Sequence, residues 1–138
     1  MHAAGTFHLE QWEETTDQTL ENGSKVTRAS VRQSFSGDLE GEGSISYLMA
    51  YRSTESAVFV GLQTFRGKVG GDAGVLVMQV TGTFEDGLAR GEWRVIPGMG
   101  TSALSSYAGE GSFQAPHGPD GTYELALERA GQTVSSEQ

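Results

Sequence analysis

The chain has 138 residues, a formal net charge of −9 and no cysteine. Its length suits one domain with a single core. The lack of cysteine excludes disulfides, thiolate metal sites and cysteine nucleophiles, and an acidic chain whose nine Lys and Arg residues are dispersed argues against nucleic-acid binding.

The N-terminal residues 1–5 have neither the basic nor the apolar region of a secretion signal, and no apolar stretch is long enough to span a membrane. We therefore expect a cytoplasmic protein that has no membrane partner. We expect residues 1–130 to form one domain and residues 131–138 to form a flexible tail.

Alternation of apolar and polar residues predicts eight strands with turn residues between them. Asp86-Gly87, between Phe84 and Leu88, is the strongest hairpin signal. One helical turn over residues 101–107, capped by Thr101, is the only predicted helix. In chain order, the predicted strands cover residues 5–12, 26–35, 39–51, 57–69, 75–84, 88–96, 109–114 and 122–127.

Successive strands joined by short turns favour an antiparallel meander, and eight strands are enough to close it. The predicted fold class is therefore all-β, with an eight-stranded antiparallel closed β-barrel. Ile45, Tyr47 and Met49 alternate on one face of the third strand, which we predict to be the inner face.

The fourth strand is apolar on both faces, with Phe59 and Phe65 on one and Val58, Val60 and Leu62 on the other. The fifth strand has the same character. Because a barrel wall facing water would alternate, we expect a second subunit to cover these strands, which predicts a homo-oligomer.

Two similar glycine phrases, at residues 41–45 and 109–113, each place a glutamate between glycines inside a strand. Glycine inside a strand is typical of a bulge, a barrel corner or a close approach of another backbone. Because side chains alternate along a strand, Glu42 lies on the face opposite to Ile45 and Tyr47 and so points outward. A bulge would reverse this and turn Glu42 into the barrel. In that position Glu42 is the candidate catalytic acid or base, because desolvation would raise its pKa.

The loop at residues 98–103 fits a loose dinucleotide fingerprint, but no helix of the required length follows it. We therefore predict no cofactor. The histidines His2, His8 and His117 lack metal-ligand spacing, so we also predict no metal site. His117 is either a turn residue or a base at the barrel mouth.

Several polar and aromatic residues of the strands are candidates for ligand contact. Gln63 and Gln79 either form hydrogen bonds with one another or with the backbone across the sheet, or they converge on an apolar ligand. The aromatic residues either fill the core or line a cavity. The candidate ligand-binding residues are Tyr47, Tyr51, Phe59, Gln63, Gln79, Trp93 and His117.

Several stretches resemble a bacterial family of unknown function, common in actinomycetes, within the allene oxide cyclase barrel superfamily. The resemblance covers about residues 5–127. Its most distinctive segments are residues 35–42, 47–51, 82–84, 95–101 and 109–113. It implies an eight-stranded barrel with an internal cavity, often oligomeric, whose superfamily relatives guide reactive apolar substrates by cavity shape. The family commonly has Glu where this chain has Gln63, and residues 105–107 depart from its usual Leu-rich segment.

Three functions follow as hypotheses. The first is a cofactor-free cyclase or isomerase acting on a small hydrophobic molecule. The second is a module that binds such a molecule without chemistry. The third is a filled barrel with a structural role.

Overall fold

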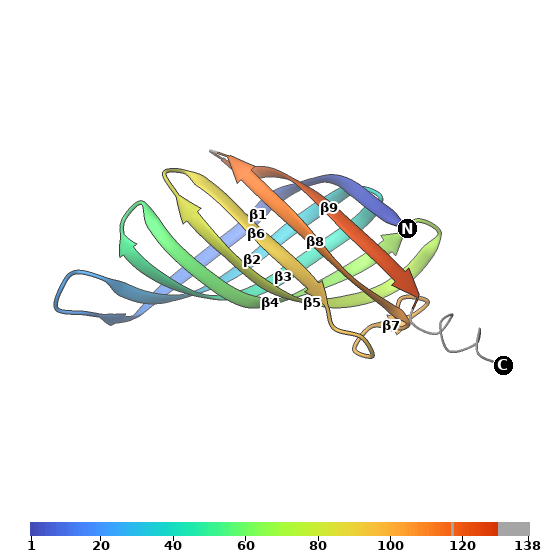
Figure 1. The fold of residues 1–138 in the computed structure, drawn as a ribbon, viewed down its shortest axis with the longest axis horizontal. Coiled ribbons are helices and arrows are strands. Elements are labelled where there is room, and N and C mark those ends of the chain that lie inside the picture. Colours follow the sequence, from blue (N-terminus) through green and yellow to red (C-terminus); the bar gives the residue numbers. More distant parts are fainter. Residues whose placement is uncertain (117, 130–138) are drawn as a thin grey trace.

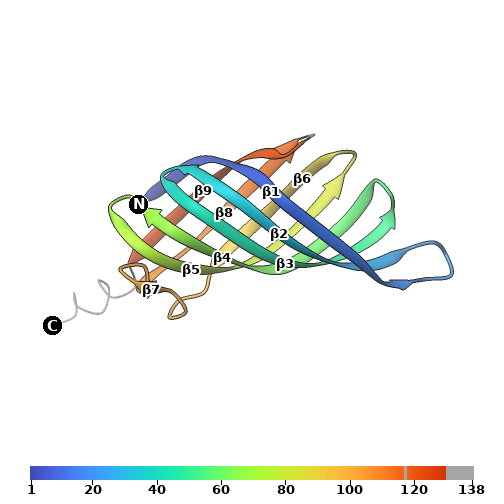
Figure 2. The same cartoon turned by 180° about the vertical axis from the view of Figure 1, so that it is seen from behind.

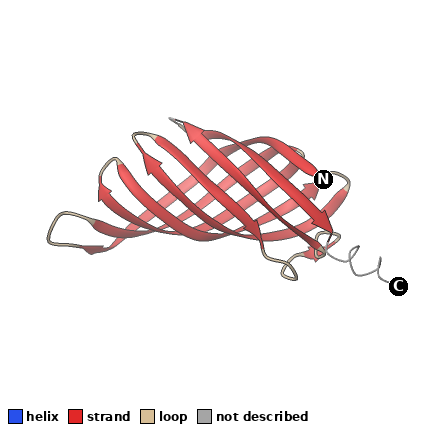
Figure 3. Cartoon of the chain, in the orientation of Figure 1, coloured by secondary structure: helices blue, strands red, loops and turns tan. Residues whose placement is uncertain are grey.

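The computed structural model describes residues 1–116 and 118–129. Within these residues, every assigned element is a β-strand (Figure 3). The described part contains no helix that could span a membrane. The strands are β1 (His2–Thr19), β2 (Lys25–Gly37), β3 (Leu39–Ser53), β4 (Ser56–Val69), β5 (Asp72–Glu85), β6 (Leu88–Val95), β7 (Thr101–Ser102), β8 (Tyr107–Pro116) and β9 (Asp120–Arg129).

The strands close into a barrel in which all neighbours are antiparallel (Figures 1 and 2). The order is β4-β3-β2-β1-β9-β8-β6-β5, and β5 pairs back with β4. The two residues of β7 add to β5 opposite Gly74 and Val75. The predicted eight-stranded antiparallel barrel is therefore confirmed.

The segment at residues 101–107 is not the helical turn that the sequence predicted. Thr101 and Ser102 are extended and pair with β5. The following turns are closed by hydrogen bonds three residues apart, such as Leu104 N to Thr101 O at 3.1 Å. Ser102 has a φ of 55°, a left-handed value that interrupts a right-handed helix.

The core lies on the inner face of the sheet, as the alternation predicts. Ile45, Tyr47 and Met49 of β3 are buried, whereas the residues between them are exposed. The strongest packing is aromatic, since the rings of Phe35, Phe65, Trp93, Phe113 and Tyr123 form a chain of contacts with centroids 5.4 to 6.0 Å apart. This chain fills the middle of the barrel.

The two ends of the barrel differ. At one end, which we call the closed end, the Tyr123 hydroxyl accepts a hydrogen bond from Leu39 N at 2.8 Å and donates one to Ser36 O at 2.9 Å. There Asp72 also accepts hydrogen bonds from Tyr107 and Arg129. These contacts join the ends of strands that are far apart in sequence.

The other end, which we call the mouth, lies where β1, β3, β5 and β8 finish. The β1–β2 hairpin extends beyond the other strands at this end (Figures 1 and 2). The sequence predicted that the first strand ends at Trp12, but β1 continues to Thr19 and pairs with β2 along its length. The hairpin therefore forms an additional wall beside the mouth.

The glycine phrase in β3 does not form a bulge. The register of β3 with β2 and β4 is continuous through Gly41 and Gly43. A Cβ atom at Gly41 would lie 2.2 Å from Arg66 O, and one at Gly43 would lie 2.7 Å from the ring of Phe35. The glycines are needed for close approach of a backbone and an aromatic ring. Register shifts lie elsewhere, in β1 between Leu9 and Gln11 and between Thr16 and Gln18, and at the end of β3 between Tyr51 and Ser53.

The outer face of β4 exposes a row of large apolar side chains. Val60 and Leu62 are 50% and 54% exposed, and Leu48 of β3 lies beside Val60. On β5, by contrast, Val77 is buried within the chain itself. The prediction that a second subunit covers this surface stays a prediction.

Candidate functional site

A cavity of about 190 Å³ opens at the mouth of the barrel. An apolar cavity of about 150 Å³ can hold a benzene molecule, so the space is adequate for a group the size of one ring. Its lining is almost entirely apolar and comes from both the barrel wall and the β1–β2 hairpin. The lining residues are Phe7, Leu9, Trp12, Gln33, Tyr47, Met49, Phe59, Phe84, Gly87, Ala89, Phe113, Ala115, Gly118 and Pro119.

One amide faces this apolar lining. Gln33 of β2 is only 9% exposed, and its side-chain oxygen Oε1 has no hydrogen-bond partner among the described residues. Buried acceptors are normally paired, because leaving one unpaired costs about 1–3 kcal/mol. Gln33 thus places a buried, unpaired amide oxygen in the wall of the cavity.

A carboxylate lies next to the cavity on the same hairpin. Because the bulge at Glu10 shifts the parity of β1, Trp12 and Glu14 lie opposite Val31 and Ala29, which are buried on the inner face of β2. Trp12 lines the cavity, and its Nε1 donates a hydrogen bond to Glu14 Oε1 at 2.9 Å.

Glu14 is held in its ionised form by its neighbours. The buried Thr27 hydroxyl donates to Glu14 Oε2 at 2.6 Å. Partial burial pushes the pKa of Glu14 upward, but hydrogen bonds from Thr27, Trp12 and Tyr51, together with the charge of Lys25, outweigh it and hold that pKa below its ordinary value.

Tyr51 completes this corner of the mouth. Desolvation, followed by the nearby charge of Glu14, raises the pKa of Tyr51 to about 12. Its hydroxyl oxygen lies 3.9 Å from Met49 Sδ, and the ammonium of Lys25 lies 5.0 Å from its ring centroid. Tyr51 is therefore a protonated hydroxyl between an anion and a cation.

Two of the residues predicted to bind a ligand line the cavity itself. Tyr47 and Phe59 are both buried there, with ring centroids 5.0 Å apart. Burial raises the pKa of the Tyr47 hydroxyl, which keeps it neutral. Tyr51, also predicted, lies half-buried at the rim.

Two predicted site residues lie on the wrong side of the barrel wall. Glu42 is exposed on the outer face of β3, opposite Ser34 and Arg66, because the expected bulge is absent. The inward orientation that a catalytic Glu42 requires is therefore not present. Gln79 is exposed on the outer face of β5 and does not converge on the interior.

Two other predicted residues are buried below the cavity. Gln63 is 1% exposed, and both polar atoms of its amide lack a hydrogen-bond partner among the described residues. The indole Nε1 of Trp93 is likewise buried without a partner. Neither side chain lines the mouth cavity. The remaining candidate, His117, lies outside the described residues.

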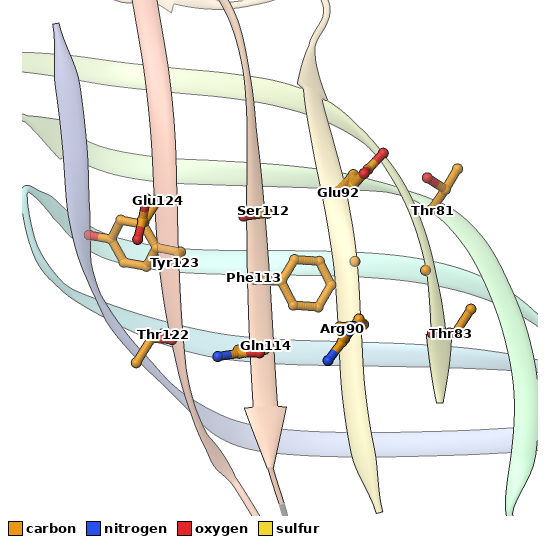
Figure 4. A pocket seen from close by; sticks show the side chains of 12 residues that line it. Thr81, Thr83, Arg90, Glu92, Ser112, Phe113, Gln114, Thr122, Tyr123 and Glu124 are labelled. Carbon is orange, nitrogen blue, oxygen red and sulfur yellow. The ribbon is translucent and has the colours of Figure 1, made fainter. Parts of the chain in front are cut away.

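A wider groove of about 730 Å³ lies on the outer face of β5, β6, β8 and β9 (Figure 4). Exposed polar side chains such as Thr81, Glu92 and Ser112 project over it. It has neither the apolar lining nor the enclosure of the mouth cavity, so we take the mouth as the candidate site.

The sequence contained a signal for Glu14 that parity analysis of β3 overlooked. Phe7 and Leu9 occupy odd-numbered positions, whereas Trp12 occupies an even-numbered one, so a regular strand would point them to opposite faces. All three can face the core only if a bulge lies between Leu9 and Trp12. Placing that bulge in β1 moves Glu14, rather than Glu42, toward the inner face.

The chain matches a protein family and is similar to solved structures. Residues 3–127 match the family described as "Protein of unknown function (DUF3224)". One similar solved structure is a protein of unknown function of that family from Shewanella oneidensis MR-1, with a TM-score of 0.74 and 23% identity over 94% of this chain and 97% of that one. No curated protein shows a significant match. At this identity, the structural likeness supports the fold alone.

Proposed function

The chain belongs to the DUF3224 family, and we propose that its barrel binds a small, mainly apolar molecule in the mouth cavity. The observation that carries this proposal is the combination of an apolar enclosure with one buried, unpartnered acceptor, Gln33 Oε1. Such sites bind a ligand mainly by burying its apolar surface, and a few polar groups fix the orientation of the ligand.

The size of the cavity limits the ligand. Below it, the aromatic rings of the core occupy the barrel, so an occupant has about 190 Å³ within the mouth. A ligand with one ring, or an alkyl group of similar volume, fits this space. The superfamily resemblance of the sequence to allene oxide cyclase barrels supports the choice of an apolar ligand, although a long chain would have to extend out of the mouth.

Titration with benzyl alcohol, followed by calorimetry, tests the proposal. Ala89 lines the cavity, and Ala89→Leu would occupy part of its volume. We expect binding to the unmodified chain and at least a several-fold weaker affinity of A89L. Ala73 is exposed on the outer face of β5, so Ala73→Leu is the matched control and should bind as the unmodified chain does.

Failure of benzyl alcohol and of toluene to bind at millimolar concentration would contradict the proposal. It would favour instead the third hypothesis, a filled barrel with a structural role. Equal binding by A89L would also contradict it, because the ligand would then lie outside the cavity.

A cofactor-free isomerase or cyclase is the second candidate, and Glu14 is the observation that favours it. A carboxylate that stays ionised beside an apolar cavity can stabilise positive charge that develops on a reacting molecule. An enzyme of this kind should lose turnover on Glu14→Gln and keep its affinity for neutral ligands. A binding module has no turnover to lose.

A further inference from the structure

A carboxylate and an amide bring hydrogen-bond acceptors to the mouth. Gln33 lines the cavity, and its buried side-chain oxygen has no partner among the described residues. Glu14 accepts hydrogen bonds from Trp12, Thr27 and Tyr51. Because an ionised carboxylate has about four lone-pair sites, Glu14 can accept one more hydrogen bond from an occupant that is a donor.

Aromatic rings also lie at the mouth. Trp12 and Tyr47 line the cavity with ring centroids 6.2 Å apart, and Tyr51 lies at the rim. The Nζ of Lys25 already lies 5.0 Å from the centroid of the Tyr51 ring, where the ring attracts the ammonium. The rim therefore accommodates one ammonium group within the chain itself.

The charge around the mouth favours cations. Among the described residues of the hairpin and of the turns at this end, carboxylates outnumber Lys and Arg. Two of the four cations are already in ion pairs, Arg28 with Asp17 and Arg52 with Glu85. The carboxylates are Glu10, Glu13, Glu14, Asp17, Glu21, Glu55, Glu85, Asp86 and Asp120, and the cations are Lys25, Arg28, Arg32 and Arg52.

The chain as a whole reinforces this local field, since its formal net charge is −9. Such a field raises the local concentration of cations at an apolar cleft and lowers that of anions. A carboxylate ligand at the rim would also be repelled by the ionised Glu14.

We propose that the ligand of the mouth is a small organic cation, a protonated amine carried on an apolar body about the size of one ring. This inference rests on the proposed ligand-binding function and names its ligand class. The body occupies the cavity between Tyr47, Met49 and Phe59, and the ammonium group lies at the rim and donates a hydrogen bond toward Glu14.

Three probes of one shape test the proposal: benzylamine, benzyl alcohol and benzoate, titrated at pH 7 and followed by calorimetry. We expect benzylamine to bind more tightly than benzyl alcohol and benzoate to bind more weakly than both. Glu14→Gln should weaken benzylamine about tenfold, since a hydrogen bond to a charged group is lost, and leave benzyl alcohol nearly unchanged.

The matched control is Glu13→Gln, which removes the same charge from the next residue of β1. Glu13 is exposed, accepts a hydrogen bond from Gln11 and faces away from the mouth. It should change benzylamine affinity less than about twofold, through the long-range field alone. Lys25→Met, which removes the internal ammonium, should increase benzylamine affinity.

The outcomes separate this inference from the function on which it rests. If benzyl alcohol binds and benzylamine binds no more tightly, the ligand is not a cation and the binding function stands. The same holds if E14Q and E13Q weaken benzylamine equally. If no probe binds, the ligand-binding function fails, and the cation proposal fails with it.

Discussion

Gln63 places an amide in the barrel core with no hydrogen-bond partner among the described residues. We expect Gln63→Met, a substitution of similar length and volume, to raise the free energy of unfolding by about 1–3 kcal/mol, because it removes an unpaired buried polar group. Urea denaturation measures the change. Gln79→Met, on the exposed outer face, is the control and should lie within about 0.5 kcal/mol of the unmodified chain.

A loss of stability in Q63M would contradict this account of the core. It would mean that the amide is satisfied by a water molecule enclosed in the barrel.

The pKa of Glu14 depends on a single hydroxyl more than on any other neighbour that lowers it. Thr27 donates the first of the hydrogen bonds that offset the desolvation of Glu14. We expect Thr27→Val to raise the pKa of Glu14, measured by NMR titration of its side-chain carboxyl carbon. Thr15→Val, on the opposite face of the hairpin, should leave that pKa unchanged.

The same shift makes stability depend on pH. Because the pKa of Glu14 is lower in the folded chain than in the unfolded one, its contribution is present above the ordinary glutamate pKa and is lost as pH falls through the folded value. T27V should therefore lose less stability than the unmodified chain between neutral and acid pH. An equal loss in both would contradict the role of the Thr27 hydroxyl.

At the scale of the strands, alternation predicted most of the barrel because apolar residues recur at every second position of β2, β3 and β9. It missed the end of β1, because the polar run from Glu13 to Gln18 shows no alternation. That run is held extended by pairing with β2, a tertiary contact that the first strand alone does not encode.

The candidate site was predicted in part for the same reason. Tyr47 and Phe59 follow unbroken alternation and were placed correctly on the inner face. The orientations of the Glu42 and Glu14 side chains both depend on where a bulge lies. Glycine content predicted a bulge near Glu42 in β3, whereas the bulge that sets the orientation of Glu14 lies in β1 between Leu9 and Gln11. The location of a bulge depends on the partner strand, which local composition does not identify.

Glycines inside the strands make room for aromatic rings. A Cβ atom at Gly82 would lie 2.5 Å from Phe59 Cζ and 2.4 Å from Arg90 O. We expect Gly82→Ala to lower the free energy of unfolding by about 1–3 kcal/mol, because the ring and the backbone must move apart. Thermal and urea denaturation measure the effect.

Gly71 provides the control for this substitution. It lies in the turn between β4 and β5, and a Cβ atom there would meet nothing within 4 Å. Gly71→Ala should change stability by less than about 0.5 kcal/mol. If G82A were equally harmless, close ring packing would not explain the glycines of the strands.

At the scale of the whole molecule, the apolar surface of β3 and β4 bears on the predicted homo-oligomer. Val60 is half exposed at its centre, between Leu48 and the polar Thr81. If a second subunit covers this face, sedimentation should show an assembly larger than one chain, and Val60→Lys should dissociate it. A single-chain species at high concentration would contradict the prediction.

The molecule as a whole combines a core filled by aromatic rings with one open end. The closed end is held by Tyr123 and by the contacts of Asp72, Tyr107 and Arg129. The mouth keeps a cavity, an unpaired acceptor and a carboxylate. This arrangement places the proposed binding site at one end of the barrel rather than along its length.

The position of a bound ring is the most direct test of that claim. Nuclear Overhauser effects should connect the ring protons of benzyl alcohol with the methyl groups of Met49, Ala89 and Ala115, which line the mouth cavity. Effects to Thr81 and Thr83 of the outer groove, with none to the mouth residues, would place the ligand outside the barrel and contradict the account.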